Sequence, residues 1–473
     1  MSTTDTGDAA SVGRNTFVYV TAALAALNGL LFGFDTGIIS GAFLYIKQTF
    51  TMSPLVRGIV VSGAMAGAAA GAALGGKLAD RIGRRRLILL GAVVFFIGSL
   101  TMAVAPNVPI LILGRLIDGV AIGFASIVGP LYISEIAPPK IRGALTSLNQ
   151  LMVTIGILVS YFVNYAFAGA GAWRWMLGAG MVPAVMLAVG MLKMPESPRW
   201  LYERGRHDEA REVLERTREG SVEEELAEIE ETVSKQSGTG FGDLFQSWLR
   251  PALVVGLGLA VFQQITGINA VLYYAPTVLE STGFGSSTSI LATVGIGVIN
   301  VVMTVVAIAL IDRVGRRLLL LVGVGGMVLT LGVLGAVFYM PGFSGALGWF
   351  ATGSLMLYVA FFAIGLGPVF WLLISEIYPL SVRGTAMGAV TVANWGANLL
   401  VSLTFPILTA NVGTPSTFWL FGGLSVLALV FTYAVVPETK GRSLEEIESD
   451  LRENVGTTGG SDAGDSSPDS ADD

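Results

Sequence analysis

Apolar residues form long runs along almost the whole chain, and shorter polar or charged segments separate them. A helix that crosses a bilayer takes roughly 20 predominantly apolar residues, and it satisfies its own backbone hydrogen bonds, as lipid requires. Twelve runs meet this length. We therefore predict twelve membrane-spanning helices, near residues 17–46, 55–78, 86–105, 110–134, 143–168, 172–194, 250–279, 288–311, 317–340, 346–374, 383–410 and 415–436.

The polar segments divide the chain into domains. We expect a disordered N-terminus at 1–16 and two bundles of six helices at 17–198 and 250–440. Residues 199–249 are rich in Glu, Arg and Ala, which indicates linker helices at the membrane surface. After the last span we expect a cytoplasmic C-terminal helix at 441–455. A Gly/Ser/Asp-rich tail at 456–473 has the composition of a disordered segment.

The composition agrees with a polytopic membrane protein and excludes several other classes. Of the 473 residues, 53% are hydrophobic and only 13% are charged. There is no Cys, and the single His, His207, lies in a charged stretch, so thiolate and histidine metal sites are excluded. No nucleophile–base pair is apparent. We expect no enzyme activity, no catalytic residues, no cofactor, no metal and no nucleic-acid partner.

Lysine and arginine in the loops predict the orientation, because they favour the cytoplasmic side. The loops after the second and eighth spans are basic: they contain Lys77, Arg81, Arg84, Arg85, Arg86, Arg313, Arg316 and Arg317. The opposite side contains only Lys47, Arg57 and Arg174. We therefore expect a multi-pass protein of the cell membrane with both termini and the linker in the cytoplasm.

Two halves of the chain repeat each other. The segment Asp80-Arg81-Ile82-Gly83-Arg84-Arg85 recurs as Asp312-Arg313-Val314-Gly315-Arg316-Arg317. Ser134-Glu135-Ile136 recurs as Ser375-Glu376-Ile377, and Pro195-Glu196 as Pro437-Glu438. The offsets of 232, 241 and 242 residues are similar enough to indicate duplication of a six-span unit. Duplicated halves around a site at mid-membrane suit alternating access.

The segment from 263 to 276 lies within an apolar run but contains two glutamines, an asparagine and two tyrosines: Gln263, Gln264, Asn269, Tyr273 and Tyr274. On an ideal helix Gln264 and Asn269 would point about 140° apart, so they converge only if the helix is broken. Gly267 and Pro276 favour such a break. Broken helices at mid-membrane form substrate sites in many transporters, and uncharged amides and phenols suit a polyhydroxyl ligand. The alternative is that these groups only hold helices together.

Further amides and aromatic residues lie in other spans. Asn394 and Asn398 are four residues apart and share a helix face, with Trp395 beside them. Trp371 follows Gly365-Leu366-Gly367-Pro368, which predicts another break. Aromatic rings stack on sugars and amides bond their hydroxyls, although each Trp alone suits a packing role. By the same reasoning we expect the amides of Gln150 and Asn300 to face inward.

An ionisable group lies inside the first span. Inserting such a group costs roughly 2.5–3.5 kcal/mol, so Asp35 is a functional candidate. Its expected partner is Arg115, the basic residue placed well inside a span. A carboxylate that alternates between an arginine and a proton is a coupling device, whereas a static pair would only fix helix register. Asp118, three residues from Arg115, shares its face and could compete for it.

The two basic loops and the acids after the fourth and tenth spans predict a cytoplasmic gate. Such a network would close that side and break when it opens; the alternative is ordinary positive-inside topology. The gate candidates are Asp80, Arg84, Glu135, Arg142, Asp312, Arg316, Glu376 and Arg383.

The chain resembles the sugar porter family of the major facilitator superfamily over residues from about 17 to 453. The combination of motifs is specific, although the Asp-Arg-x-Gly-Arg-Arg loop alone marks only the wider superfamily. The motifs are Asp80 to Arg85, Pro195-Glu196-Ser197-Pro198-Arg199-Trp200-Leu201, Gln263-Gln264 through Asn269 to Pro276, and Pro437-Glu438-Thr439-Lys440-Gly441. The resemblance implies an all-α membrane fold of twelve transmembrane helices in two pseudo-symmetric six-helix bundles.

The resemblance also implies roles for individual residues. Asp35 matches the proton-coupled members, Arg115 matches the family's arginine partner, and Ile157 is like the facilitative members, which leaves the sugar open. Asp118 departs from the family pattern. The implied sugar contacts are Gln150, Gln263, Gln264, Asn269, Asn300, Trp371 and Asn394, with Trp395, Asn398 and Phe362 as weaker assignments.

These observations predict a monomeric, proton-coupled importer of a hexose or pentose, with the lipid bilayer, the sugar and the proton as its partners. Three alternatives stay open at this point. The first two are an uncoupled facilitative carrier and a sodium-coupled carrier of a sugar or polyol, and the third is a sugar sensor that does not transport.

Overall fold

The computed structural model describes residues 5–139, 141–218, 222–235, 242, 244, 246–339, 346–379, 382–442 and 446. Every regular element in these ranges is a helix. Twelve helical segments are long and apolar enough to span a membrane, which confirms the predicted number. They run over Thr16–Thr49, Pro54–Ile82, Arg84–Ala103, Val108–Ile136, Arg142–Ala168, Trp173–Met191, Ser247–Glu280, Ser286–Val314, Arg316–Val337, Leu347–Ile377, Arg383–Asn411 and Thr414–Val435.

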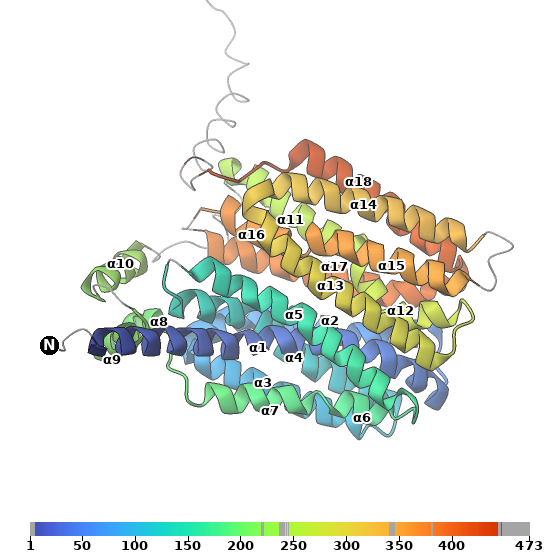
Figure 1. Cartoon of the computed structure of the whole chain (residues 1–473), viewed down its shortest axis with the longest axis horizontal. Helices are drawn as coiled ribbons and strands as arrows, with labels where there is room; N and C mark the ends of the chain where they lie inside the picture. The colour runs from blue at the N-terminus through green and yellow to red at the C-terminus, as the bar shows by residue number, and fades with distance from the viewer. Residues whose placement is uncertain are drawn as a thin grey trace, which may run out of the picture.

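The first half of the chain forms one bundle of six spans (Figure 1). Its helices are α1 (Asp5–Thr49), α2 (Pro54–Ile82), α3 (Arg84–Ala103), α4 (Val108–Ile136), α5 (Arg142–Ala168), α6 (Trp173–Gly178) and α7 (Met181–Met191). The last span consists of α6 and α7 together. Helix α1 begins at Asp5, so most of the range expected to be disordered is helical, because extending an existing helix is far easier than starting one.

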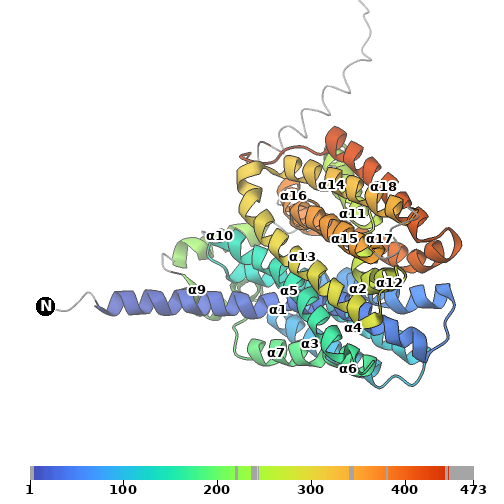
Figure 2. The same cartoon turned by 45° about the vertical axis from the view of Figure 1, so that its right-hand side comes forward.

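The second half forms the other bundle, whose spans lie beside the first in both views (Figures 1 and 2). Its helices are α11 (Arg250–Ile265), α12 (Ile268–Glu280), α13 (Ser286–Val314), α14 (Arg316–Val337), α15 (Leu347–Ile364), α16 (Pro368–Ile377), α17 (Arg383–Asn411) and α18 (Thr414–Val435). Helices α11 and α12 form one interrupted span, and α15 and α16 form another.

Short helices connect the bundles within the expected linker: α8 (Pro198–Glu203), α9 (His207–Thr217), α10 (Val222–Lys235) and the 3₁₀ turn η2 (Ser247–Leu249). The linker contacts the first bundle through Trp200, whose indole donates to the carbonyl of Asp80 at 2.8 Å. Arg218 donates to the carbonyl of Ile136 at 2.6 Å. The expected C-terminal helix and tail lie outside the described residues, apart from residues 441, 442 and 446.

Small residues allow the helices of a bundle to approach closely. A Cβ atom on Gly33 of α1 would collide with the carbonyl of Val153 on α5. A Cβ atom on Gly67 of α2 would likewise collide with the carbonyl of Leu116 on α4. In lipid, packing of this kind replaces the hydrophobic effect as the force that joins helices.

The internal duplication is visible in the backbone. Gly83 joins α2 to α3 with φ 100° and ψ 155°, and Gly315 joins α13 to α14 with φ 102° and ψ 159°. Such positive φ angles are available to glycine at little cost, which explains why both copies of the loop have glycine there. The two halves therefore share this turn in geometry as well as in sequence.

The two bundles contact each other from the middle of the molecule to one of its ends. We call the end with α8–α10 the linker end and the opposite end the far end. Near the far end, the Tyr161 hydroxyl of α5 donates to the carbonyl of Leu272 on α12 at 3.1 Å. Leu44 and Ala168 of the first bundle also pack with Ile290 of the second. The described hydrogen bond and apolar contact therefore join the bundles in the half of the molecule towards the far end.

Candidate functional site

The span formed by α11 and α12 is interrupted at Gly267. This residue has φ 95°, in the left-handed region, and helix α12 restarts at Ile268. The interruption leaves few backbone groups unpaired, because the hydroxyl of Tyr358 donates to the carbonyl of Thr266 at 2.9 Å. The Gly267 amide donates to the carbonyl of Gln264 at 2.9 Å. The predicted break is therefore present at Gly267, whereas Pro276 lies within α12.

The break brings amides together that a straight helix would separate. Asn269 donates to Gln264 at 2.6 Å, although the two lie on opposite sides of the break. Gln264 donates to Asn394 of α17 at 3.1 Å, and Asn394 donates to Gln263 at 2.7 Å. We call Gln263, Gln264, Asn269 and Asn394 the amide cluster. Three of its members are at most 4% exposed, so the cluster lies inside the second bundle.

The amide cluster is tied to the second interrupted span. Gln263 donates to the carbonyl of Leu366 at 2.8 Å. Leu366 lies between α15 and α16, where Gly365 and Gly367 have non-helical backbone angles. Trp371 is in the first turns of α16 and is half-buried. The two breaks predicted from the sequence therefore adjoin one another.

The structure places the other predicted sugar contacts on separate helices. Asn300 of α13 is 5% exposed, and Gln150 of α5 is half-buried. Within the described part of the chain, no hydrogen bond links Gln150, Asn300 or Trp371 to the amide cluster. Their assignment as sugar contacts stays a prediction.

Of the weaker assignments, Trp395 and Asn398 lie beside the cluster on α17, whereas Phe362 is half-buried on α15. Asn398 donates to the hydroxyl of Tyr273 at 3.4 Å and accepts from Ser402 at 3.0 Å. The Trp395 ring lies 5.3 Å from the ring of Phe32 on α1. Its buried indole N–H has no hydrogen-bond partner among the described residues. A donor of this kind is available to a ligand between the bundles.

The predicted intramembrane ion pair is present. The guanidinium of Arg115 on α4 donates to the carboxylate of Asp35 on α1, and both side chains are at most 1% exposed. Arg115 also donates to the carbonyl of Val61 on α2 at 3.2 Å. Three helices of the first bundle therefore meet at this arginine. A buried pair of this kind needs such additional hydrogen bonds to offset the loss of hydration.

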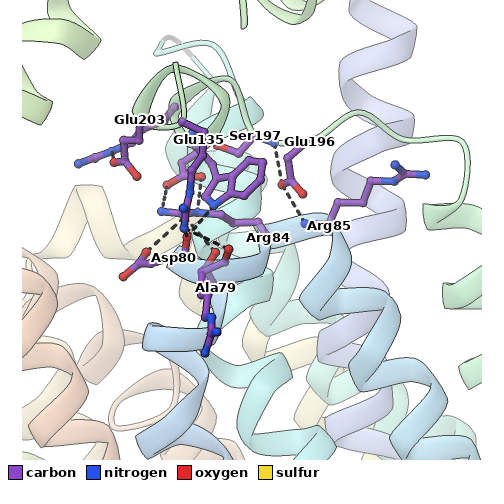
Figure 3. A network of polar contacts seen from close by, with 12 residues as sticks. Ala79, Asp80, Arg84, Arg85, Glu135, Glu196, Ser197 and Glu203 are labelled. Carbon is purple, nitrogen blue, oxygen red and sulfur yellow. Dashed lines mark hydrogen bonds and ion pairs between the residues drawn. The ribbon is translucent and has the colours of Figure 1, made fainter. Parts of the chain in front are cut away.

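A second polar network lies at the linker end of the first bundle (Figure 3). Arg84 donates to both oxygens of Glu135, at 3.1 and 3.2 Å, and pairs with Asp80 at 3.2 Å. Its remaining N–H contact is with the carbonyl of Ala79 at 3.2 Å. This bidentate geometry fixes the ends of α2, α3 and α4 relative to one another.

The second bundle repeats the network. Arg316 donates to Glu376 at 3.2 and 2.8 Å and to Asp312 at 3.1 Å. The hydroxyl of Thr439 donates to the same carboxylate at 2.5 Å. Each arginine–glutamate pair therefore lies within a single bundle: Arg84–Glu135 in the first and Arg316–Glu376 in the second.

The other two predicted gate arginines are not part of these pairs. Arg142 is exposed at the start of α5, and Arg383 donates to the carbonyl of Tyr378 at 3.1 Å. Glu135 and Glu376 instead bind Arg84 and Arg316, because packing of neighbouring helices brings the loop arginines closer than the arginine beyond the next turn. The sequence pattern indicates these eight residues as one group but does not indicate which acid pairs with which arginine.

Two features of the structure were not predicted from the sequence. Glu196 accepts from the backbone amide of Arg85 at 3.0 Å, and Glu438 accepts from those of Arg316 and Arg317 at 2.9 and 3.1 Å. Each carboxylate therefore binds the N-terminus of a helix, where the helix dipole favours negative charge. The repeated Pro-Glu dipeptides were the signal for this role.

These contacts affect the acidity of Glu438. Burial alone would raise the pKa of this carboxyl, but hydrogen bonds from the amides of Lys440, Arg316, Arg317 and Thr439 outweigh burial and lower the pKa. The ionised carboxylate is the form that can accept these bonds.

The other missed feature joins the bundles. Lys47 at the end of α1 forms an ion pair with Glu280 at the end of α12, and Ser286 donates to the same carboxylate at 2.9 Å. Sequence offered only a weak signal, since Lys47 is one of the few cations expected on its side of the membrane.

Comparisons with known proteins agree with this architecture. The family model described as "Sugar (and other) transporter" matches residues 21–451. The chain is 45% identical over 440 residues to the glucose transporter GlcP of Staphylococcus epidermidis, which covers 93% of this chain and 98% of that protein. It is 43% identical over 452 residues to the galactose-proton symporter of Escherichia coli, with 94% and 97% covered.

A solved structure extends the similarity to the fold. The xylose transporter XylE from Escherichia coli, in a partially occluded inward open conformation, has a TM-score of 0.80 and 34% sequence identity. The match covers 90% of this chain and 100% of that one. The protein is therefore a multi-pass membrane transporter that belongs to the sugar porter family of the major facilitator superfamily.

Proposed function

We propose that this protein is a secondary active transporter that moves a monosaccharide, a hexose or a pentose, together with a proton. The observation that carries the proposal is the buried pair of Asp35 and Arg115 in a membrane span. A charge in such a place is costly and is typical of ion pathways and proton relays. The similarity to a galactose-proton symporter supports the same function.

The amide cluster is the proposed sugar site. Each amide has both donor and acceptor groups, so its members can exchange their mutual hydrogen bonds for bonds to sugar hydroxyls. Gln150, Asn300 and Trp371 complete the proposed site from α5, α13 and α16. Trp371 supplies an aromatic face, and the uncharged surroundings favour a neutral ligand over an anion or cation.

Asp35 is the proposed proton-binding group, and Arg115 senses its charge. When Asp35 binds a proton it loses its attraction for the guanidinium, which then has to find another acceptor. This exchange changes the contacts among α1, α2 and α4, the three helices that meet at Arg115. Proton binding is thereby coupled to the rearrangement of the first bundle.

The proposed cytoplasmic gate consists of Asp80, Arg84, Glu135 and Arg142 with Asp312, Arg316, Glu376 and Arg383. The described hydrogen bond and ion pair that join the bundles lie towards the far end, the rings of Phe32 and Trp395 approach near the middle, and the two arginine–glutamate pairs stay within their own bundles. This arrangement fits a carrier that is closed at the far end and open at the linker end. In the proposed closed state of the linker end, Arg142 and Arg383 form contacts between the bundles.

The distribution of basic residues supports an orientation with the linker end, and so both termini, in the cytoplasm. The far end is then extracellular. We infer that the protein works in the cell membrane as a monomer, because each chain contains both halves of the proposed pathway.

Uptake into proteoliposomes tests this function. Purified protein is reconstituted, and labelled galactose, xylose and glucose are added with an inward proton gradient, an inward sodium gradient or no gradient. We expect one of these sugars to accumulate against its concentration gradient only when the proton gradient is present. A protonophore abolishes this accumulation.

Variants connect the activity to the site. Asp35→Asn should abolish accumulation while exchange of sugar down its gradient is retained. The matched control is Asp208→Asn on the exposed linker helix α9, which should accumulate sugar normally. If the sugar only equilibrates, and neither the proton nor the sodium gradient changes its uptake, the protein is an uncoupled carrier. Accumulation that depends on the sodium gradient would contradict proton coupling. Sugar binding with no uptake would identify a sensor.

A further inference from the structure

A second acid is buried beside the Asp35–Arg115 pair. Asp118 lies on α4, three residues after Arg115 and therefore on the same side of that helix. Its side chain is only 1% exposed. One carboxylate oxygen accepts from the hydroxyl of Ser99 on α3 at 3.4 Å, and the other has no hydrogen-bond partner among the described residues. Such an orphaned buried oxygen is uncommon and calls for an explanation.

The structure makes room for this carboxylate. A Cβ atom on Gly98 of α3 would collide with the carboxylate of Asp118, so only glycine leaves the necessary space. The neighbouring ion pair is also incompletely satisfied: Asp35 Oδ2 and Arg115 Nε lack partners in the described part of the chain. Three buried groups in one place therefore each retain an unused hydrogen-bonding atom.

The charges of these three groups do not balance. Arg115 stays protonated in proteins, whereas Asp35 and Asp118 each lose a charge on binding a proton. With both acids ionised the cluster has a net charge of −1, and one bound proton makes it neutral. Because an uncompensated charge in a membrane span is costly, the neutral form with one proton is strongly favoured.

Among the residues that the structure describes, no other charged side chain takes part in this balance. The titratable groups that interact with the cluster are Tyr273 and Tyr274 of α12, besides its own members on α1 and α4. Helix α2 has its charged residues near its two ends, and α3 has them in its first turn, away from Ser99. Asp118 is therefore the available alternative anion for Arg115.

We propose that Asp35 and Asp118 share the transported proton, and that Arg115 pairs with whichever of the two carboxylates is ionised. In the arrangement described here Arg115 binds Asp35, so the proton resides on Asp118. When the proton moves to Asp35, the guanidinium shifts to Asp118 and no buried cation is left unpaired. The proton enters from water on one side and leaves to water on the other, without any other reactant.

This inference rests on the proposed proton coupling and deepens it. Its test is the dependence of sugar uptake on external pH in proteoliposomes. Asp118→Asn removes the second carboxylate, so Asp35 can bind a proton only by leaving Arg115 unpaired. We expect the pH of half-maximal uptake to fall by roughly one unit or more, the size typical of the loss of one nearby charge. Sugar exchange should remain measurable.

Ser99→Ala is a second test variant, and it should shift the pH of half-maximal uptake in the opposite direction. The hydroxyl of Ser99 stabilises ionised Asp118, so its removal favours proton binding and raises the pH of half-maximal uptake. A third comparison uses exchange in Asp35→Asn, which should keep a pH dependence that disappears in the double variant with Asp118→Asn. If Asp118→Asn fails to fold, the shift in Ser99→Ala and the retained pH dependence of exchange in Asp35→Asn still test the proposal.

The outcomes separate this inference from the proposed function. If the unchanged protein shows no proton-driven accumulation, the proposed function is wrong. If it accumulates sugar but the pH profiles of Asp118→Asn and Ser99→Ala both match it, proton coupling stands and the shared proton is disproved. Asp208→Asn on α9 is the control that should keep the original profile.

Discussion

The ammonium group of Lys47 at the end of α1 contacts the carboxylate of Glu280 at the end of α12, so an ion pair joins the two bundles at the far end. The side chains are 22% and 26% exposed, which places the pair at the surface rather than in the core. Ser286 of α13 orients the same carboxylate. The pair exists only while the far ends of the bundles are together, and it therefore favours the closed far end.

Lys47→Gln should make the far end open more often. An ion pair of this exposure contributes roughly 0.2–1 kcal/mol, which corresponds to a change of at most about fivefold in the population of the open state. The protein contains no cysteine, so a single introduced cysteine reports without background. Ala168→Cys lies in the buried contact between Leu44 and Ile290. An impermeant maleimide should label this cysteine faster when Lys47→Gln is also present than when it is absent.

Glu280→Gln provides the matched partner of this experiment. Each single variant should accelerate labelling to a similar extent, and the double variant should add little more, because both changes remove one interaction. High salt should reduce the difference between the variants and the original protein. Independent, additive effects would show that the two residues act through other contacts.

Gly267→Ala should destabilise the protein and weaken sugar binding. An alanine would be held in the left-handed region, at a cost of roughly 1–2 kcal/mol, and its Cβ atom would collide with the ring of Phe421. The geometry that brings Asn269 to Gln264 depends on this residue. Thermal unfolding of the purified protein and sugar binding measure the two effects.

Gly332→Ala is the control for that substitution. Gly332 lies in the regular helix α14, and a Cβ atom there would meet no atom within 4 Å. Alanine is a better helix former than glycine, so stability should be unchanged or slightly higher. Equal losses in both variants would contradict the role assigned to Gly267.

Asn394→Ala should reduce both sugar affinity and stability. This side chain bonds Gln263, Gln264 and the carbonyl of Ala260, so its removal leaves buried polar groups unpaired. Each such group costs roughly 1–3 kcal/mol of stability, and a bound sugar hydroxyl that lacks the Asn394 amide costs a similar amount, which predicts a loss of affinity of at least about fivefold. Equilibrium sugar binding measures the change.

Asn411→Ala on the same helix is the comparison. Its amide is exposed and donates only to the carbonyl of Ile407 within α17, so sugar affinity should stay the same. Should Asn394→Ala bind sugar normally, the amide cluster would have a structural role and the sugar site would lie elsewhere.

Glu438 should make stability depend on pH. Its pKa is lower in the folded protein than its ordinary value of 4.5, so the ionised form contributes stability that is fully present above pH 4.5. That contribution is lost as the pH falls towards the folded-state pKa. Glu438→Gln should lower the melting temperature at pH 7, and the difference from the original protein should shrink below pH 4.5.

Glu215→Gln controls for a general loss of negative charge, since this residue is exposed on α9. Its melting temperature should follow that of the original protein at every pH. A Glu438→Gln variant whose deficit is the same at pH 7 and pH 3.5 would show that the amide contacts do not depend on ionisation.

The sequence by itself determined the number of spans, their approximate limits and the duplication of the six-span unit. The physical reason is that lipid requires long apolar helices, so each span can be predicted from the apolar run of residues that forms it. The pairing of Asp35 with Arg115 was predictable for a related reason. Buried charges in a membrane are rare, so two opposite charges have few other partners.

Only the tertiary structure decided which polar residues meet. The convergence of Gln264 with Asn269 depends on the backbone angles at Gly267, and the bond from Gln264 to Asn394 depends on how α17 packs. Helix packing also determines that Glu135 pairs with Arg84, and that Lys47 of the first bundle pairs with Glu280 of the second. Such contacts depend on the rotation and approach of helices far apart in sequence, which local patterns do not specify.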